Sequence, residues 1–301
     1  MSAQGLLMDV KRFAVHDGPG IRTTLFLKGC SLKCIWCHNP EGIPAKPQLA
    51  YYEHKCICCG ECVKVCPVQA HSVGQIGHVF DRTKCIGCGK CEQVCLGEAL
   101  KHYGRKVSVE EAVQIAMEDA DFYGTEGGVT ISGGEPLLQV DFVVEFLSAM
   151  KKKGIHTAVD TCGNVPQEAY ESILPYTDMF LYDIKHITPD GHRKLTGKTN
   201  ERILSNIRFL ADHETRIEVR IPLVPGCNDD LETLNGMAAF LAELRIERVK
   251  ILPYHSLARS KYRALGMEDT MPDVESPSDE RLHEVAELFK AKGVNAVSGR
   301  D

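Results

Sequence analysis

The sequence predicts an α/β fold in which a parallel sheet curls into a partial barrel of six βα units. Short runs of β-branched and aromatic residues alternate with amphipathic helical patterns along most of the 301 residues, and this alternation is typical of parallel sheets with right-handed crossovers. A cysteine-rich stretch interrupts the alternation at residues 47–100. We therefore expect two domains: a core formed by residues 1–46 and 101–301, and an insert formed by residues 47–100.

Each expected strand is a short apolar run bounded by turn or helix signals. The first, IRTTLFL at residues 21–27, has β-branched and aromatic residues on both faces, as buried parallel strands do. The expected strands cover residues 21–27, 128–132, 155–160, 179–184, 217–224 and 249–253. They imply a partial barrel, because the closed barrel of this type needs eight βα units.

The expected helices have apolar residues spaced three and four positions apart. Ser108 and Glu111 form a capping box at the start of the first helix. The helical patterns cover residues 109–116, 140–150, 167–174, 201–211, 231–244 and 278–292. Because they alternate with the strands, each can serve as the crossover between two parallel strands.

Composition excludes several classes of protein. The 35 basic and 41 acidic residues give a net charge of −6, which is not the footprint of a nucleic-acid-binding protein. No uncharged apolar run reaches membrane-spanning length, and residues 1–20 hold no secretory signal. The 14 cysteines cluster in C-x2-C spacings, which favours metal ligation in a reducing compartment over disulfides. We expect a cytoplasmic monomer that binds neither nucleic acid nor membranes.

Cys30, Cys34 and Cys37 form a C-x3-C-x2-C array directly after the first expected strand. Three thiolates so close in sequence can hold one iron-sulfur cube and leave its fourth iron open to a ligand. The array follows the carboxyl end of a strand, where α/β barrels place their chemistry. A structural zinc site is the alternative, but zinc sites usually pair two C-x2-C units, and His38 adjoins Cys37 too closely to join its tetrahedron.

With Trp36 before the third cysteine, this array resembles the signature of the radical S-adenosylmethionine (radical SAM) enzymes. In that family the methionine moiety of the cofactor chelates the open iron. A second motif, Gly133-Gly134-Glu135-Pro136, follows the second expected strand. Its paired glycines let a ligand approach the backbone, and Glu135 can accept from an ammonium group. The resemblance implies that this motif receives the methionyl amino group, although a simple tight turn explains the glycines equally well.

The insert contains two C-x2-C-x2-C-x3-C runs and resembles a two-cluster bacterial ferredoxin module. In such a module the fourth cysteine of each run ligates the other cluster. The resemblance therefore implies one 4Fe-4S cluster on Cys56, Cys59, Cys62 and Cys95, and a second on Cys85, Cys88, Cys91 and Cys66. Two zinc ribbons are the alternative, which the spacing disfavours.

Three other residues of the insert fall outside this pattern. Cys58 is surplus to it and is interpreted as a spare thiol, with a role as an alternate ligand left open. We interpret His71 and His78 as ordinary surface or loop histidines.

The segments outside the insert are similar to the activating enzymes of glycyl radical enzymes. The similarity lies in DGPGIRT at residues 17–23, CHNPEG at residues 37–42, the run 160–185, VRIPLVPG around Arg220 and ILPYHSL around His255. It covers most of the chain outside the insert. The insert points to the subgroup that serves decarboxylases, dehydratases, and C–S or C–N lyases.

This resemblance gives roles to single residues. It implies a sodium or potassium ion on Asp160, Thr161 and Asp183, and cofactor contacts from Lys185 and His255. The remaining implied cofactor contacts are Trp36, Cys37, His38, Gly133, Gly134, Glu135, Asp183 and Ile184. Arg220 is implied to lie near the cofactor carboxylate or the incoming peptide. Taken singly, the aspartates could equally serve as helix caps or solvated surface groups.

The implied function is that of an oxidoreductase with three 4Fe-4S clusters. An electron from reduced flavodoxin or ferredoxin passes through the insert clusters to the cluster on Cys30, Cys34 and Cys37. S-adenosylmethionine is then cleaved to methionine and a 5′-deoxyadenosyl radical, which takes an α-hydrogen from a glycine of the partner glycyl radical enzyme. The sequence does not name that partner.

Two alternatives remain at this stage. One is a radical SAM enzyme that acts on a small molecule, with auxiliary clusters in the insert. The other is an electron-transfer protein whose clusters only relay electrons. The second is disfavoured because a relay gains nothing from an open iron or from the Gly-Gly-Glu-Pro turn.

The cysteine spacing generates a prediction. Replacing Cys30, Cys34 or Cys37 by alanine abolishes 5′-deoxyadenosine formation and leaves the insert clusters in place, because those thiolates hold only the first cluster. Iron analysis of the unmodified protein prepared without oxygen is expected to approach about twelve atoms per chain, roughly four per cluster. A stable zinc content with negligible iron contradicts the interpretation.

Overall fold

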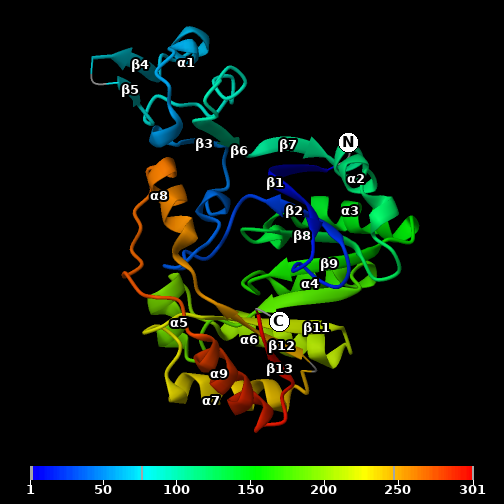
Figure 1. The fold of residues 1–301 in the computed structure, drawn as a ribbon. Helices are drawn as coiled ribbons and strands as arrows, with labels where there is room; N and C mark the ends of the chain where they lie inside the picture. Colours follow the sequence, from blue (N-terminus) through cyan, green and yellow to red (C-terminus); the bar gives the residue numbers. More distant parts are fainter. Residues whose placement is uncertain (1–2, 76, 247, 300–301) are drawn as a thin grey trace.

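One large sheet organises the computed structural model, which describes residues 3–75, 77–246 and 248–299 (Figure 1). Residues 1–2, 76, 247 and 300–301 belong to the ranges of the two expected domains but lie outside the described residues. The sheet has the strand order β13-β12-β11-β10-β9-β8-β2-β1-β7. Its strands are β1 Gln4–Ala14, β2 Arg22–Leu27, β7 Arg105–Ser108, β8 Gly128–Gly133, β9 His156–Thr161, β10 Met179–Asp183, β11 Ile217–Leu223, β12 Arg248–Pro253 and β13 Ala296–Ser298.

The sheet is parallel from β2 through β13, and the expected strands are all present. The prediction of a mostly parallel α/β sheet is therefore confirmed. The sheet is wider than expected, because β1 and β7 add antiparallel strands at one edge and β13 adds a parallel strand at the other. The described strand order has two ends, so the sheet does not close on itself.

The helices predicted from periodicity are also confirmed, as α2, α3, α4, α6, α7 and α9. The described helices are α1 Glu61–Val65, α2 Val109–Met117, α3 Val140–Lys152, α4 Gln167–Ile173, α5 Pro189–Thr196, α6 Glu201–Asp212, α7 Leu231–Glu243, α8 Arg259–Leu265 and α9 Asp279–Lys290. At the start of α2, the Ser108 hydroxyl accepts from the Glu111 N–H at 3.2 Å, as the capping box predicts. Helices α1, α5 and α8 were not predicted, because α1 lies within a cysteine run and because α5 and α8 have too few apolar residues to show a helical period.

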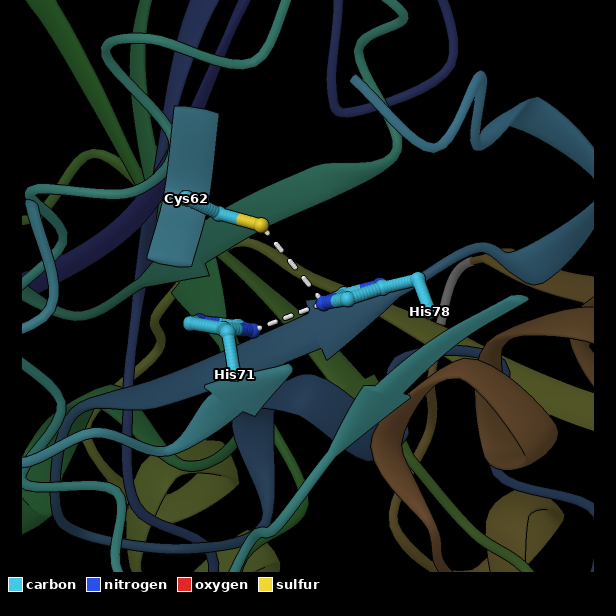
Figure 2. A group of neighbouring side chains, drawn as sticks. All are labelled: Cys62, His71 and His78. Atoms are coloured by element: carbon cyan, nitrogen blue, oxygen red, sulfur yellow. Dashed lines mark hydrogen bonds between the residues drawn. The ribbon is translucent and has the colours of Figure 1, made fainter. Parts of the chain in front are cut away.

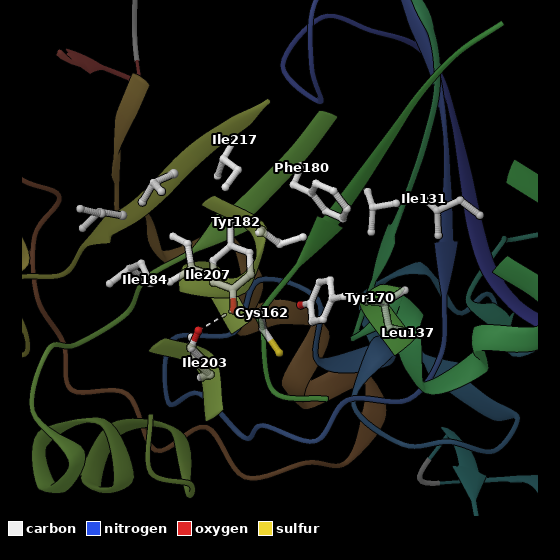
Figure 3. Packing of buried hydrophobic residues seen from close by; sticks show 14 of the residues in the cluster. Ile131, Leu137, Cys162, Tyr170, Phe180, Tyr182, Ile184, Ile203, Ile207 and Ile217 are labelled. Carbon is white, nitrogen blue, oxygen red and sulfur yellow. Dashed lines mark hydrogen bonds between the residues drawn. The ribbon is translucent and has the colours of Figure 1, made fainter. Parts of the chain in front are cut away.

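Buried aromatic side chains hold the strand ends of the core domain. Figure 3 shows Tyr170, Phe180 and Tyr182 lying together beside Cys162, within the hydrophobic core. The Tyr182 hydroxyl donates to the Ile203 carbonyl at 2.7 Å, so its polar atom is satisfied inside the core. This packing fixes the ends of β9 and β10, which carry predicted site residues.

The cysteine-rich segment stands clear of the large sheet, with α1 and the pair β4 His71–Gly74 and β5 Gly77–Phe80 at its far end (Figure 1). Its base is the antiparallel pair β3 Gln48–Tyr51 and β6 Leu100–Tyr103, so the base crosses the expected boundary at residue 100. Helix α8 packs against β3. The Arg82 guanidinium ties the two parts together, because it donates to the carbonyls of Leu49 at 2.9 Å and of Ala264 at 2.6 Å.

Among the described residues, no helix combines the length and the apolar character that crossing a membrane requires.

Candidate active site

The loop that carries Cys30, Cys34 and Cys37 follows β2 and is closed by its own backbone. The Gly29 N–H donates to the Gly42 carbonyl at 2.7 Å. A β-carbon on Gly134 would lie 2.2 Å from the carbonyl oxygen of Gly29 and 2.6 Å from that of Gly42. The Gly-Gly turn after β8 is therefore needed to seat the cysteine loop. From the sequence we expected the paired glycines to let a ligand approach the backbone. In the structure the backbone of the cysteine loop makes this close approach.

The three thiols of this loop lie close enough to perturb one another. Burial raises the pKa of Cys37 to about 12, with a further contribution from Cys30. Burial also raises the pKa of Cys34. A hydrogen bond with the Cys162 thiol lowers the pKa of Cys30 against the effect of burial. Half-buried thiols of this kind ionise when a metal centre supplies positive charge, so the donor set fits an iron-sulfur cluster.

Lys185 and Asp183, both predicted site residues, lie beside this loop. Lys185 Nζ is 2.5 Å from an Asp183 carboxylate oxygen, and the lysine is only 8% exposed. Burial lowers the pKa of Lys185, but Asp183, Cys34 and Cys162 outweigh burial and raise it. The lysine therefore stays charged, and its cation lies near the cysteine loop. Ile184, between the two, is buried and donates its N–H to the Arg220 carbonyl at 3.0 Å.

Asp160 is the second-last residue of β9, and Asp183 is the last residue of the neighbouring strand β10. One of the Asp160 carboxylate oxygens accepts from the Ser132 hydroxyl at 2.6 Å, and the other lies 3.8 Å from the Arg220 guanidinium. Burial raises the pKa of Asp160 to about 6; Arg220 opposes this shift and Asp183 adds to it. The two aspartates therefore interact, as their positions at adjacent strand ends predict.

Arg220 is 7% exposed and also pairs with Glu218 at 3.4 Å. Burial lowers its pKa, but Asp160, Glu218 and other carboxylates outweigh burial and raise it. The guanidinium also donates to the His16 carbonyl at 2.6 Å. The structure therefore surrounds Arg220 with partners from its own chain, and its predicted contact with the cofactor or a peptide stays a prediction.

Two predicted ligand contacts have protein partners instead. Glu135 is fully buried, and its carboxylate accepts from the Cys162 N–H at 2.8 Å, the Thr161 hydroxyl at 2.9 Å and the Leu137 N–H at 3.1 Å. The Thr161 hydroxyl also bonds the hydroxyl of Tyr170 at 2.9 Å. The structure therefore does not support the Glu135 carboxylate as acceptor for the ammonium group or the Thr161 hydroxyl as a cation ligand. Both side chains tie the turn after β8 to the end of β9.

Four predicted cofactor residues meet in one pocket at the end of β12. The pocket is open to solvent and has about 190 Å³ of empty space. It is lined by Ile35, Trp36, Cys37, His38, Tyr254, His255, Ser256, Ala258, Arg259, Tyr262, Asp269 and Met271. The His38 ring nitrogen Nε2 lies 3.0 Å from the His255 carbonyl oxygen, and the two rings are 3.9 Å apart. Burial lowers the pKa of His38 to about 4, so this ring is neutral near pH 7.

Helix α8 supplies a site residue that the sequence did not reveal. Lys261 donates to the His38 carbonyl at 3.0 Å, to Asn39 Oδ1 at 3.2 Å and to the buried Glu41 carboxylate at 2.6 Å. It thereby fixes the segment after Cys37. A single lysine in a short polar helix carries no sequence signal, because its partners lie more than 200 residues away.

The insert cysteines lie close to one another, and their division into two clusters stays a prediction. A pocket of about 310 Å³ of empty space is lined by Cys66, Cys85, Cys88 and Cys91, together with Leu49, Val68, Ala70, His71, Ile86, Gly89 and Lys90. In the other set, burial raises the pKa of the Cys62 thiol, with further contributions from Cys56, Cys59 and Cys95. Cys58 is exposed and has a left-handed backbone with φ 54°. Each predicted group of four cysteines is therefore close in space.

The interpretation of His71 and His78 as ordinary surface or loop histidines is wrong. His71 is 4% exposed and lies on β4, and His78 lies half-buried on β5 (Figure 2). Burial lowers the pKa of His71 to about 4, and His78 adds to this shift. Their ring nitrogens and the Cys62 sulfur all lie within 4.8 Å of one another. This cluster could not be predicted from the sequence, because β4 and β5, which bring the two histidines together, were not predicted.

Comparisons with known proteins match most of the chain. The family model described as the Radical SAM superfamily matches residues 24–235. The trans-4-hydroxy-L-proline dehydratase activating enzyme of Clostridioides difficile is 43% identical over 98% of this chain and 99% of that protein. The indoleacetate decarboxylase activating enzyme of Tractidigestivibacter scatoligenes is 38% identical over 98% of this chain and 97% of that protein.

One solved structure supports the fold alone. A radical SAM methyltransferase from Sphaerobacter thermophilus is 16% identical and has a TM-score of 0.51. The match covers 92% of this chain and 66% of that chain.

The contacts of Lys261 generate a prediction. Replacing Lys261 with methionine leaves the Glu41 carboxylate buried without its ion-pair partner, which is expected to lower the free energy of unfolding by about 3 kcal/mol. Urea denaturation of anaerobically prepared protein measures the change. The matched control is Lys290→Met, which removes an exposed pair with Glu287 and is expected to cost at most about 1 kcal/mol. Equal losses in the two variants would contradict a special role for Lys261.

Proposed function

The chain belongs to the radical SAM superfamily and, within it, to the activating enzymes of glycyl radical enzymes, and from this premise we propose how its residues install the radical. The observation that carries the proposal is the position of Cys30, Cys34 and Cys37 beside the Lys185–Asp183 ion pair. The three thiolates hold a 4Fe-4S cluster with one open iron. When bound, this cluster supplies the electron that cleaves S-adenosylmethionine to methionine and a 5′-deoxyadenosyl radical.

The chain's own residues hold and orient the cofactor. Lys185 places its ammonium group near the cluster loop, where it offsets the negative charge of the cofactor carboxylate. The pocket that contains Trp36, His38 and His255 borders Cys37 and provides further cofactor contacts. These groups position the reacting bond and exclude water, and the chemistry needs no acid-base pair from the protein.

We include in the proposal a monovalent cation, sodium or potassium, near Asp160 and Asp183. The two carboxylates interact at adjacent strand ends, and burial raises the pKa of Asp160. A hard cation bound by the carboxylate oxygens would offset the cost of burying their negative charge. The Thr161 hydroxyl is not included, because Glu135 and Tyr170 engage it.

The proposal gives the insert two further 4Fe-4S clusters that relay electrons. One is held by Cys56, Cys59, Cys62 and Cys95, and the other by Cys85, Cys88, Cys91 and Cys66. The grouping of each set supports this arrangement, and cubes of this type reach low potentials. The donor is a reduced flavodoxin or ferredoxin.

The partner is a glycyl radical enzyme. The following experiment tests which glycyl radical enzyme this chain activates. The protein is incubated with S-adenosylmethionine, reductant and, in turn, a trans-4-hydroxy-L-proline dehydratase and an indoleacetate decarboxylase, the enzymes that the similar activating enzymes are named for. Electron paramagnetic resonance is expected to show a glycyl radical on one partner, and Cys34→Ala is the inactive control. Formation of 5′-deoxyadenosine with no radical on any glycyl radical enzyme would favour a small-molecule substrate.

The cation site generates a separate prediction. Replacing Asp183 with alanine removes a carboxylate from the site, so cofactor binding is expected to weaken and any stimulation by sodium or potassium to disappear. Isothermal titration at several potassium concentrations measures both effects. Asp190→Ala, which changes an aspartate whose side chain is 93% exposed, is the control. Unchanged affinity in Asp183→Ala at every potassium concentration would refute the site.

The relay also has its own test. Cys59→Ala and Cys88→Ala are expected to slow turnover driven by flavodoxin or ferredoxin far more than turnover driven by dithionite, which reaches the first cluster directly. Cys58→Ala, at the surplus thiol, is the control and is expected to change neither rate. Iron analysis verifies that each variant keeps the cluster on Cys30, Cys34 and Cys37. Equal losses with both reductants would indicate a docking or structural insert.

A further inference from the structure

A pair of imidazoles lies against one cysteine of the insert (Figure 2). His78 Nε2 is 3.5 Å from Cys62 Sγ and 3.0 Å from His71 Nδ1. Cys62 comes from helix α1, whereas the histidines come from β4 and β5. The β4–β5 pair therefore places both rings beside the sulfur of Cys62. Cys62 belongs to the first insert set, which consists of Cys56, Cys59, Cys62 and Cys95.

Aromatic packing holds the two rings in place. His71 stacks on Phe80, with ring centres 4.8 Å apart and an angle of 16° between the planes. Tyr51 meets His78 edge to face at 4.6 Å. His71 and His78 also stack on each other at 5.1 Å. Because several contacts fix these rings, they can present a hydrogen-bond donor in a constant geometry. Groups that orient the ligands of a metal centre need such a fixed geometry.

The proton positions follow from the chemistry of Cys62. A cysteine that ligates iron is a thiolate and has no proton to give. If His78 Nε2 were unprotonated, its lone pair would face the thiolate and repel it. The stable arrangement therefore has the proton on His78 Nε2, where Cys62 Sγ and His71 Nδ1 share it as acceptors.

The two cysteine sets have different surroundings. The pocket of the second set is lined by Leu49, Val68, Ala70 and Ile86, with His71 and Lys90 also on its wall. His71 thus lies between the two sets. Among the described residues, the imidazole contact to a cysteine sulfur falls on Cys62 of the first set.

We propose that His78 donates a hydrogen bond to the Cys62 thiolate and thereby raises the reduction potential of the cluster on Cys56, Cys59, Cys62 and Cys95. Reduction adds negative charge to the cluster and its thiolates, and a fixed N–H dipole stabilises the more negative state. The inference rests on the proposed insert clusters.

The experiment measures the potentials of both insert clusters in the full-length chain. Cys30, Cys34 and Cys37 are replaced by alanine so that only the insert clusters report, and the redox titration is followed by electron paramagnetic resonance. His78→Phe is expected to shift one cluster to a more negative potential and leave the other unchanged. His71→Phe keeps the aromatic stack but removes the competing acceptor, so it is expected to shift the same cluster to a more positive potential.

The control is His283→Phe, an exposed position on α9, which is expected to change neither potential. If His78→Phe keeps both clusters and their potentials, the inference is refuted. If His78→Phe loses a cluster, the His71→Phe variant tests the inference in its place. Unchanged potentials of both insert clusters in His71→Phe then refute the inference.

Iron analysis separates this failure from a failure of the proposed clusters. The three-alanine background is expected to hold about eight iron atoms, roughly four per cluster. Negligible iron, or a zinc ion held by Cys62, His71 and His78, overturns the proposed insert clusters together with this inference. Eight iron atoms with unshifted potentials overturn the inference alone.

Discussion

The close contact between two backbone turns is the constraint on which the active edge of the sheet depends. The carbonyls of Gly29 and Gly42 approach Gly134 so closely that no side chain fits there. This contact clamps the cysteine loop between the ends of β2 and β8. Glu135 extends the clamp to β9, because its buried carboxylate holds Thr161 and the Cys162 N–H. Three neighbouring strand ends are thus locked together before any cofactor binds, which is how a protein keeps a reactive centre in a fixed position.

The charged residues at this edge form ion pairs with one buried and two half-buried acidic side chains. Lys185 pairs with Asp183, Arg220 lies near Asp160, and Lys261 pairs with Glu41. Lys185 and Lys261 lie outside the cysteine loop in the sequence, so other segments of the chain hold the positive groups near the loop. An anionic cluster and a cofactor carboxylate both require such compensation in a partly dehydrated site.

Helix α8 connects this edge to the insert. At one point Lys261 holds the segment that follows Cys37, and a few residues later the Ala264 carbonyl accepts from Arg82 of the insert. Gly266 ends the helix with a left-handed φ of 65°, and a β-carbon there would lie 2.5 Å from the Arg82 side chain. The insert is therefore docked on an element that also lines the pocket beside Cys37.

Local patterns in the sequence determined the alternation of strands and helices, the cysteine sets and the family. Those features are encoded by residues a few positions apart, because side-chain period and ligand spacing are local properties. Tertiary structure decided the rest. The edge strands β1, β7 and β13 join the sheet through distant pairing, and Lys261 and the His71–His78 pair acquire their roles only from contacts with residues that local periodicity does not link to them. The same holds for Glu135. Its motif suggested a contact with a ligand, but in the structure the side chain is buried and its carboxylate accepts hydrogen bonds from the protein itself. No local sequence pattern records this burial.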